Sequence, residues 1–223
     1  MSHSFLRTLI ASVTLAVVFA APASAFIEKR HFDRYYGTRA LEVADPNGGP
    51  IAPFEPNQSD LEEEFAFEWE GYTITAVHGF GIEALVLGRK NYTQGDLGAL
   101  VPIDLALGWG QVSDPAWVKH LRVEQSERVY RWFYPRGTPL DPETVAVNSA
   151  NMHIMPATPE IAKKLESVAR GDVVRLSGFL VDVTMSPEDG SEGFTWLTSR
   201  IRTDTGLGAC ELILVTSVDI EGR

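Results

Sequence analysis

The hydrophobic residues between Gly171 and Val183 follow a two-residue period, which indicates one long β-strand. They form two sets: Val174, Leu176 and Leu180 on one face, and Phe179, Val181 and Val183 on the other. The more apolar face changes at Gly178, where a glycine permits a bulge or a sharp bend. A strand that supplies apolar side chains first to one side and then to the other suits a small, closed barrel. We therefore expect this strand at the centre of the fold.

Strand patterns also lie on both sides of this central stretch. Phe65–Trp69 alternates apolar and polar residues, and Glu70-Gly71 predicts a turn into Tyr72–Val77, which is rich in β-forming residues. Gly79 and Gly81 predict a second break in the chain. The remaining stretches that predict strands are Ile82–Leu87, buried on both faces or in the middle of a sheet, Val123–Phe133 as a strand pair or one bent strand, Phe194–Arg202, and Cys210–Ile220. The chain is therefore expected to be mostly β.

Two helices are marked by capping residues. Asp114-Pro115 predicts the start of a short helix, because aspartate is a good N-cap and proline suits the first helical position. Thr158-Pro159 predicts the start of a longer helix, and Gly171 is placed to end it. The apolar residues of the longer helix, Ile161, Leu165 and Val168, fall on one face. The polar stretch Asn91–Ala99 is expected to be a loop.

The order of the elements predicts a single, mostly β (α+β) domain over residues 61–223. We expect a small OB-like or related β-barrel with one packed helix, Pro159–Arg170. Ahead of it, residues 26–60 show little periodicity and contain several prolines and the run Asn47-Gly48-Gly49-Pro50. Such residues favour extended or turn conformations. This part is predicted to be an extended N-terminal segment that drapes over the domain.

Residues 1–25 have the layout of a cleavable secretory signal peptide. A short amino end with Arg7 precedes the apolar run Leu9–Ala20, and the small residues Ala23-Ser24-Ala25 follow it. Cleavage is expected after Ala25. The apolar run is short for a membrane span, and no other segment approaches about 18 apolar residues. We therefore expect a soluble protein that is periplasmic or secreted, without a membrane span.

The charge balance disfavours nucleic-acid binding. The chain has 19 Lys and Arg against 30 Asp and Glu, a net charge of −11 at pH 7, and this balance repels phosphate backbones. The sequence contains one cysteine, Cys210, so stability must come from packing and not from an internal disulfide. The histidines lack the spacing of zinc ligands, so neither a metal site nor a cofactor is predicted.

The sharpest catalytic hypothesis pairs Cys210 with His153. A thiolate with an imidazole base, oriented by Asp204 or Asp104, would make a nucleophilic hydrolase. Against this hypothesis, Cys210 falls on the more apolar face of the last strand, and a thiol buried among apolar side chains is inert. His153 alternatively holds the loop before the helix by hydrogen bonds to backbone carbonyls. We therefore expect Cys210 to be structural.

A binding hypothesis rests on the polar stretch between the last strands. Arg200 and Arg202 share a face there and would clamp a carboxylate or phosphate of a small ligand, with Asp204 beside them. Trp109 and His153 complete the expected ligand contacts. The alternative is that the arginines pair internally, with Asp104, Glu124 or Glu211.

Aromatic residues provide a second element for recognition. They are Trp109, Trp117, Trp132 and Trp196, with Tyr130 and Tyr134. Together they would form a platform for a sugar or a peptide. The alternative is that they are partly buried core residues, as most tryptophans in a small β domain are.

Four motifs resemble a group of exported bacterial proteins without an assigned activity. They are Asp104–Gly110 (DLALGWG), Gln125-Ser126 with Tyr130 and Trp132, Ser149–His153 (SANMH), and Arg202–Glu211 (RTDTGLGACE). The likeness spans the chain from about Tyr72 to Val218. It implies a periplasmic location, and it supplies no catalytic residues.

These observations lead to hypotheses from different functional classes. The preferred one is a non-enzymatic binding or interaction module of the cell envelope, whose partner is a small molecule or an envelope protein. The alternative is a hydrolase that uses Cys210, His153 and Asp204. A structural subunit of an envelope assembly is a third possibility.

Overall fold

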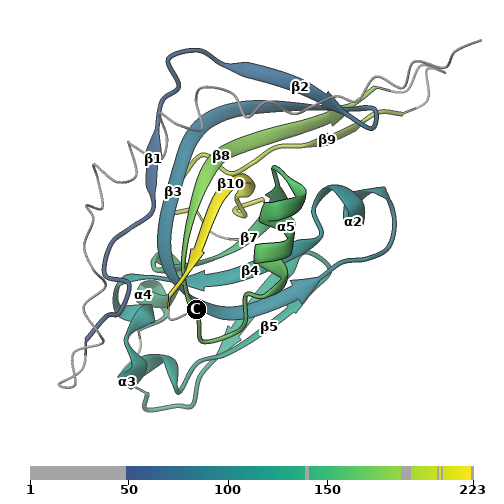
Figure 1. Cartoon of the computed structure of the whole chain (residues 1–223). Helices are drawn as coiled ribbons and strands as arrows, with labels where there is room; N and C mark the ends of the chain where they lie inside the picture. The colour runs from purple at the N-terminus through teal and green to yellow at the C-terminus, as the bar shows by residue number, and fades with distance from the viewer. Residues whose placement is uncertain (1–48, 139–140, 187–191, 205, 207, 222–223) are drawn as a thin grey trace, which may run out of the picture.

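The computed structural model describes residues 49–138, 141–186, 192–204, 206 and 208–221. Within these residues the protein is mostly β, with a few short helices (Figure 1). One large sheet contains most of the strands, and a two-stranded hairpin forms a separate sheet. The mostly β fold class predicted from the sequence is confirmed.

Short helical segments interrupt the series of strands. The strands are β1 (Asn57–Ser59), β2 (Phe65–Trp69), β3 (Tyr72–Asn91), β4 (Ile103–Gly108), β5 (Arg122–Ser126), β6 (Val129–Phe133), β7 (Ser149–Pro156), β8 (Val173–Met185), β9 (Phe194–Trp196) and β10 (Leu212–Ile220). The helical segments are α2 (Asp96–Leu100), the 3-10 turn η1 (Gly110–Ser113), α3 (Pro115–Val118), α4 (Pro142–Val147) and α5 (Pro159–Glu166).

The strand pairings of the large sheet run in a cycle. β3 pairs with β4, β4 with β7, β7 with β10 and β10 with β8, and β8 pairs back to β3. The β7–β10 pair is parallel, whereas the other four pairs are antiparallel. β1 and β2 add to β3, and β9 adds to β8. Figure 1 shows the long strands β3 and β8 curving together, with β10 beside them.

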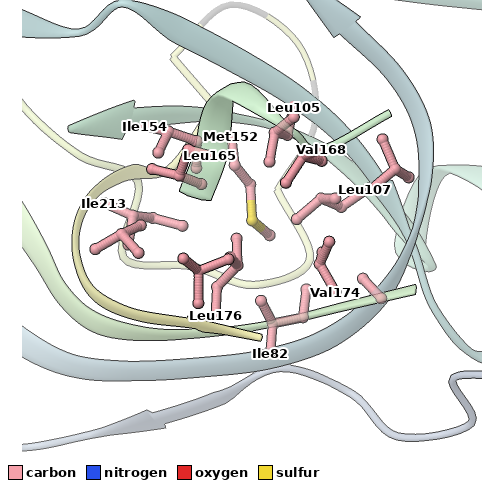
Figure 2. Close-up of a cluster of buried hydrophobic side chains, with 14 of the residues drawn as sticks. Ile82, Leu105, Leu107, Met152, Ile154, Leu165, Val168, Val174, Leu176 and Ile213 are labelled. Atoms are coloured by element: carbon pink, nitrogen blue, oxygen red, sulfur yellow. The ribbon is translucent and has the colours of Figure 1, made fainter. Parts of the chain in front are cut away.

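The main hydrophobic core is built by the strands of this cycle and α5. Figure 2 shows Met152 of β7 in the middle of it, among side chains from β3, β4, β8, β10 and α5. One predicted set of β8 residues lies in this core: Val174, Leu176 and Leu180. The other set lies in a second cluster: Phe179, Val181 and Val183. The two apolar faces predicted for the central strand are confirmed.

Gly178 lies at a close approach between the backbones of β8 and β10. A Cβ at this position would be 1.9 Å from the carbonyl oxygen of Leu214 and 2.9 Å from its carbonyl carbon. Only a residue without a side chain fits so near to a neighbouring backbone. The register of β10 shifts between Val215 and Ser217, next to the pairing of Gly178 with Val215. The irregularity expected at Gly178 is therefore a close approach to β10, and the bulge itself lies on β10.

The break predicted at Gly79 and Gly81 is wrong. β3 runs without interruption from Tyr72 to Asn91. Both glycines pair with β8 on one side and with β1 on the other. A Cβ on Gly79 would lie 2.7 Å from Oγ of Ser59, so this glycine makes room for an adjacent strand and does not turn the chain.

The two capped helices are confirmed, and the longer one ends earlier than predicted. Asp114 accepts a hydrogen bond from the N–H of Ala116 at 2.7 Å at the start of α3. Thr158 Oγ1 accepts one from the N–H of Ile161 at 3.3 Å at the start of α5. α5 ends at Glu166 and not at Arg170. Each cap satisfies an N–H group that has no partner within the helix.

Two helices are missing from the sequence prediction. α2 occupies part of the predicted loop 91–99, and α4 follows the N-cap Asp141. Both contain six residues or fewer. A helix of this length completes too few turns to show an apolar period.

The N-terminal segment packs on the domain where the structure describes it. Ala52 is fully buried, its N–H donates to Ser113 Oγ at 3.0 Å, and its carbonyl accepts from Gly110 N–H at 2.8 Å. The predicted signal peptide, residues 1–25, and residues 26–48 lie outside the described residues. None of the helices in the described part of the chain combines the length and apolar character needed to cross a membrane.

Candidate functional site

A cavity of about 770 Å³ is lined by residues of both sheets. Its walls come from β6, β7, β9 and the segment that precedes β10. The aromatic lining residues are Tyr130, Trp132, Phe194 and Trp196. The main polar ones are Arg128, Asn151, His153, Arg202, Asp204 and Cys210. A volume of this size is within the range of small-molecule sites. The structure thus brings together seven of the residues singled out from the sequence: His153, Arg202, Asp204 and Cys210, with the aromatic residues Tyr130, Trp132 and Trp196.

Asp104 of β4 lies behind the cavity wall and is fully buried. Its carboxylate accepts hydrogen bonds from Arg128 Nη1 at 2.7 Å, His153 Nδ1 at 2.8 Å and Asn151 Nδ2 at 3.4 Å. A buried carboxylate needs a paired charge and hydrogen bonds, and these three groups supply them. All three also line the cavity. Asp104 therefore fixes the side chains that a ligand would meet.

Arg128 reaches Asp104 from the tip of the β5–β6 hairpin. Glu127 and Arg128 both have positive φ, 51° and 64°, as a two-residue type I′ turn requires. Residues other than glycine rarely adopt this conformation. Side-chain contacts stabilise the turn: Arg128 Nη2 donates to the Val101 carbonyl at 2.8 Å, and the guanidinium carbon lies 3.6 Å from the ring centre of Tyr92. Arg128 therefore anchors the hairpin to the large sheet.

His153 is oriented by Asp104 and not by Asp204. Its Nδ1 lies 2.8 Å from Asp104 Oδ1, and its ring packs edge-on against Trp196 with 4.8 Å between centroids. From the sequence, either aspartate could orient His153, and the hydrolase hypothesis used Asp204; the geometry gives this role to Asp104. With Nδ1 engaged, Nε2 is the ring nitrogen that remains for a ligand in the cavity.

Cys210 lies in the cavity wall, and its predicted place in the core is wrong. β10 begins at Leu212, so the alternation that would turn Cys210 inward does not extend to it. Cys210 is half-buried. Burial is the main cause that raises the pKa of Cys210 to about 11; the charge of Asp104 acts in the same direction, whereas a hydrogen bond with Asn151 opposes it. The thiol is therefore protonated at neutral pH.

Arg202 lines the cavity and forms an ion pair with Glu211. The Glu211 side chain is 3% exposed, so the pair is largely removed from water. Burial lowers the pKa of Arg202, and the neighbouring charge of Asp204 opposes this effect. The guanidinium also lies 5.0 Å from the ring centre of Trp109. The internal pairing of Arg202 with Glu211, predicted as an alternative, is confirmed.

Two predicted ligand contacts lie outside the cavity. Trp109 is fully buried in the main core, because it follows directly on the buried strand β4. Arg200 is exposed and pairs with Asp182. The predicted strand Phe194–Arg202 forms only as β9, Phe194–Trp196, so Arg200 and Arg202 do not share a strand face. The clamp of two arginines is therefore wrong.

Asp204 lies in the cavity wall, as the binding hypothesis requires. Its Oδ2 accepts a hydrogen bond from Ser199 Oγ at 2.7 Å. Its Oδ1 is buried and has no hydrogen-bond partner among the described residues. Within the same residues, no three or more His, Cys, Asp and Glu side chains are grouped as metal ligands.

Three residues of the site were not expected from the sequence. They are Arg128, Asn151 and Phe194. One signal was available, since Asp104 is the charged residue in the apolar stretch Ile103–Gly108. A carboxylate in a strand buried on both faces requires partners from elsewhere. Nothing in the sequence indicates that Arg128 is one of them.

Comparisons with known protein families, with curated proteins and with solved structures find no match to this chain. The function is therefore inferred from the geometry of the site.

Proposed function

We propose that the protein is an exported, non-enzymatic binding module of the cell envelope, and that its partner occupies the cavity. One observation carries the proposal: aromatic side chains and oriented polar side chains face one space of about 770 Å³. Asp104 and Glu211 hold Arg128 and Arg202 from behind the wall. An apolar pocket with a few fixed polar groups has the composition of a recognition site. Export rests on the signal pattern of residues 1–25.

The position of the cavity supports the same function. The cycle has five strands, which in chain order are β3, β4, β7, β8 and β10. Around the cycle they follow one another as first, second, third, fifth and fourth. In the chain, α5 lies between the third strand, β7, and the fourth, β8. We take this cycle as an OB-like barrel. OB folds bind ligands across the second and third strands, between the first–second and fourth–fifth loops. The cavity is lined by β7, by Leu97 of the first loop, and by β9 of the last. This correspondence is an analogy at the level of the fold.

The environment of Cys210 favours recognition over nucleophilic catalysis. With a pKa of about 11, about one thiol in 10,000 is ionised at pH 7. The thiolate is the reactive form of cysteine. The side-chain hydrogen bond that lowers this pKa comes from the amide of Asn151, which cannot act as a base. The thiol therefore contributes to the cavity wall as a small, weakly polar group.

A substitution that fills the cavity is expected to abolish binding. Thr195 is exposed on β9 and lines the cavity, so Thr195→Trp places an indole in the ligand space. In a thermal-shift screen of small polar and aromatic compounds, at least one compound should raise the melting temperature of the protein. Thr195→Trp should keep its own melting temperature within about 3 °C, because the site is on the surface, and it should lose that response.

Thr138→Trp is the matched control, since Thr138 is half-buried and lies outside the cavity. It should respond to the compounds as the unmodified protein does. If compounds stabilise Thr195→Trp and Thr138→Trp equally, they bind elsewhere, and the proposed site is wrong.

A second function, a cysteine hydrolase, is favoured by one arrangement. His153 is oriented by Asp104 at 2.8 Å, and His153 and Cys210 line the same cavity. A base held by a carboxylate beside a thiol is the general plan of a cysteine nucleophile site. Such a site requires a thiol whose pKa is lowered, whereas burial raises the pKa of Cys210.

The pH dependence of thiol labelling separates the two functions. Because the pKa of Cys210 is about 11, the rate of alkylation by iodoacetamide should rise about tenfold per pH unit between about pH 7 and about pH 9. Mass spectrometry of quenched samples measures this rate. In the urea-unfolded protein, the alkylation rate should instead level off as the pH passes the ordinary pKa of a cysteine thiol, 9.0. A plateau close to neutral pH in the folded protein would identify an activated nucleophile and support the hydrolase.

A further inference from the structure

Two strand edges border the cavity. Within the part of the chain that the structure describes, β6 pairs only with β5, and β9 is the last strand of the large sheet and pairs with β8. Among the described residues, each strand therefore has one edge without a partner strand. Four consecutive residues at each place line the cavity, Val129–Trp132 and Phe194–Leu197. Consecutive side chains of a strand point to opposite faces. The cavity therefore runs along these edges and not over one face of either strand.

The hairpin turn determines which backbone groups of β6 point into this space. Ser126 and Val129 flank the two-residue turn and form its first hydrogen-bonded pair, so Arg131 forms the next one with Glu124. The N–H and C=O groups of Tyr130 and Trp132 therefore point away from β5. In the described part of the chain they bond to no other backbone segment. Such a row of unused donors and acceptors is a template for an added strand.

We propose that the cavity binds an extended peptide segment of a partner protein, which adds as a strand to the free edge of β6 beside β9. This inference rests on the proposed function and names the class of partner for the same site. In strand addition, main-chain hydrogen bonds give affinity, and pockets for alternate side chains give specificity. Tyr130, Trp132 and Trp196 supply the apolar surface for those side chains.

The charged side chains of the cavity wall indicate what kind of peptide segment fits the cavity. In a chain with a net charge of −11, the charged lining residues are Arg128, Arg131, Arg202 and Asp204. Two of the arginines are neutralised from behind by Asp104 and Glu211. Arg131 is exposed and has no ion pair within the described residues. The partner segment therefore has apolar residues at alternating positions and an acidic residue opposite Arg131.

The first experiment selects linear peptides from a random phage-displayed library and follows amide exchange by NMR. In the protein alone, the N–H groups of Tyr130 and Trp132 should exchange fast, whereas those of Val129 and Arg131 should already be protected by β5. A saturating selected peptide should slow exchange at Tyr130 and Trp132 by about tenfold or more. Peptides that bind without protecting these two N–H groups would overturn the inference.

The second experiment uses a matched pair of variants. Trp132→Ala and Trp132→Pro both lose the indole, but only proline also removes the N–H that points into the cavity, and proline is tolerated at such edge positions. The proline variant should bind the selected peptide about five- to tenfold more weakly than the alanine variant, as the loss of one hydrogen bond predicts. Equal affinities of the two folded variants would contradict strand addition. If Trp132→Pro does not fold, the amide-exchange measurement on the unmodified protein still tests whether the peptide adds as a strand.

The other outcomes are also decisive. If compounds bind the cavity in a way that depends on Thr195 and the library gives no binding peptide, the proposed function stands and this inference fails. If neither compounds nor peptides bind, both fail. If a second copy of the chain, or residues 26–48 of the same chain, protects the edge of β6, the occupant is not a partner protein, and the inference is wrong.

Discussion

Replacing Gly178 with alanine is expected to lower the free energy of unfolding by more than about 3 kcal/mol or to prevent folding. The added Cβ would lie 1.9 Å from the carbonyl oxygen of Leu214. That oxygen belongs to the backbone of a paired strand, so it cannot rotate away as a side chain would. Relief requires β8 and β10 to separate, and this pairing closes the cycle of strands. Urea unfolding followed by circular dichroism measures the loss.

Gly79→Ala provides the control for this prediction. Its Cβ would lie 2.7 Å from Ser59 Oγ, and this hydroxyl can turn aside. The free energy of unfolding should fall by less than about 1 kcal/mol. Equal losses of unfolding free energy for Gly178→Ala and Gly79→Ala would show that the close approach of β8 to β10 is not what requires a glycine at position 178.

Replacing Asp104 with alanine is expected to lower the free energy of unfolding by about 3–5 kcal/mol, the usual loss when one member of a buried ion pair is removed. Arg128 and His153 would lose the carboxylate that they share. Because Arg128 anchors the hairpin, amide exchange in β5 and β6 should also become faster. Urea unfolding measures the first effect, and hydrogen exchange measures the second.

Glu124→Ala is the matched control, since Glu124 pairs with Arg122 and these side chains are 53% and 69% exposed. An exposed pair contributes little, so the free energy of unfolding should change by less than about 0.5 kcal/mol. If Asp104→Ala has as small an effect as Glu124→Ala, the buried network does not hold the cavity wall.

The two faces of β8 could be predicted because the direction of a side chain in a strand is a local property. For each residue from Val174 to Val183, its position in the alternation is enough to predict the face on which its side chain lies. The starts of α3 and α5 could be predicted for the same reason, because a cap acts on N–H groups two or three residues away. Gly79 shows the limit of local reasoning. A glycine that turns the chain and a glycine that admits a neighbouring strand look alike in a sequence.

The cavity could not be predicted because its parts are far apart in the chain. Arg128 and His153 meet Asp104 across 24 and 49 residues. Their meeting depends on the order in which the strands pair and on the turn that directs Arg128. The positions of Cys210 and Arg200 were wrong for a related reason. Both lie just beyond the end of a strand, where the alternation stops.

The central claim is that the cavity beside Cys210 is a binding site. Its most direct test is the rate at which iodoacetamide alkylates Cys210 at about pH 9, measured by mass spectrometry with and without the best selected peptide or compound at saturation. Because Cys210 lines the cavity, a molecule that occupies the cavity should block the reagent. We expect the rate to fall by about tenfold or more. An unchanged rate at full saturation would show that the bound molecule lies elsewhere and would contradict the account.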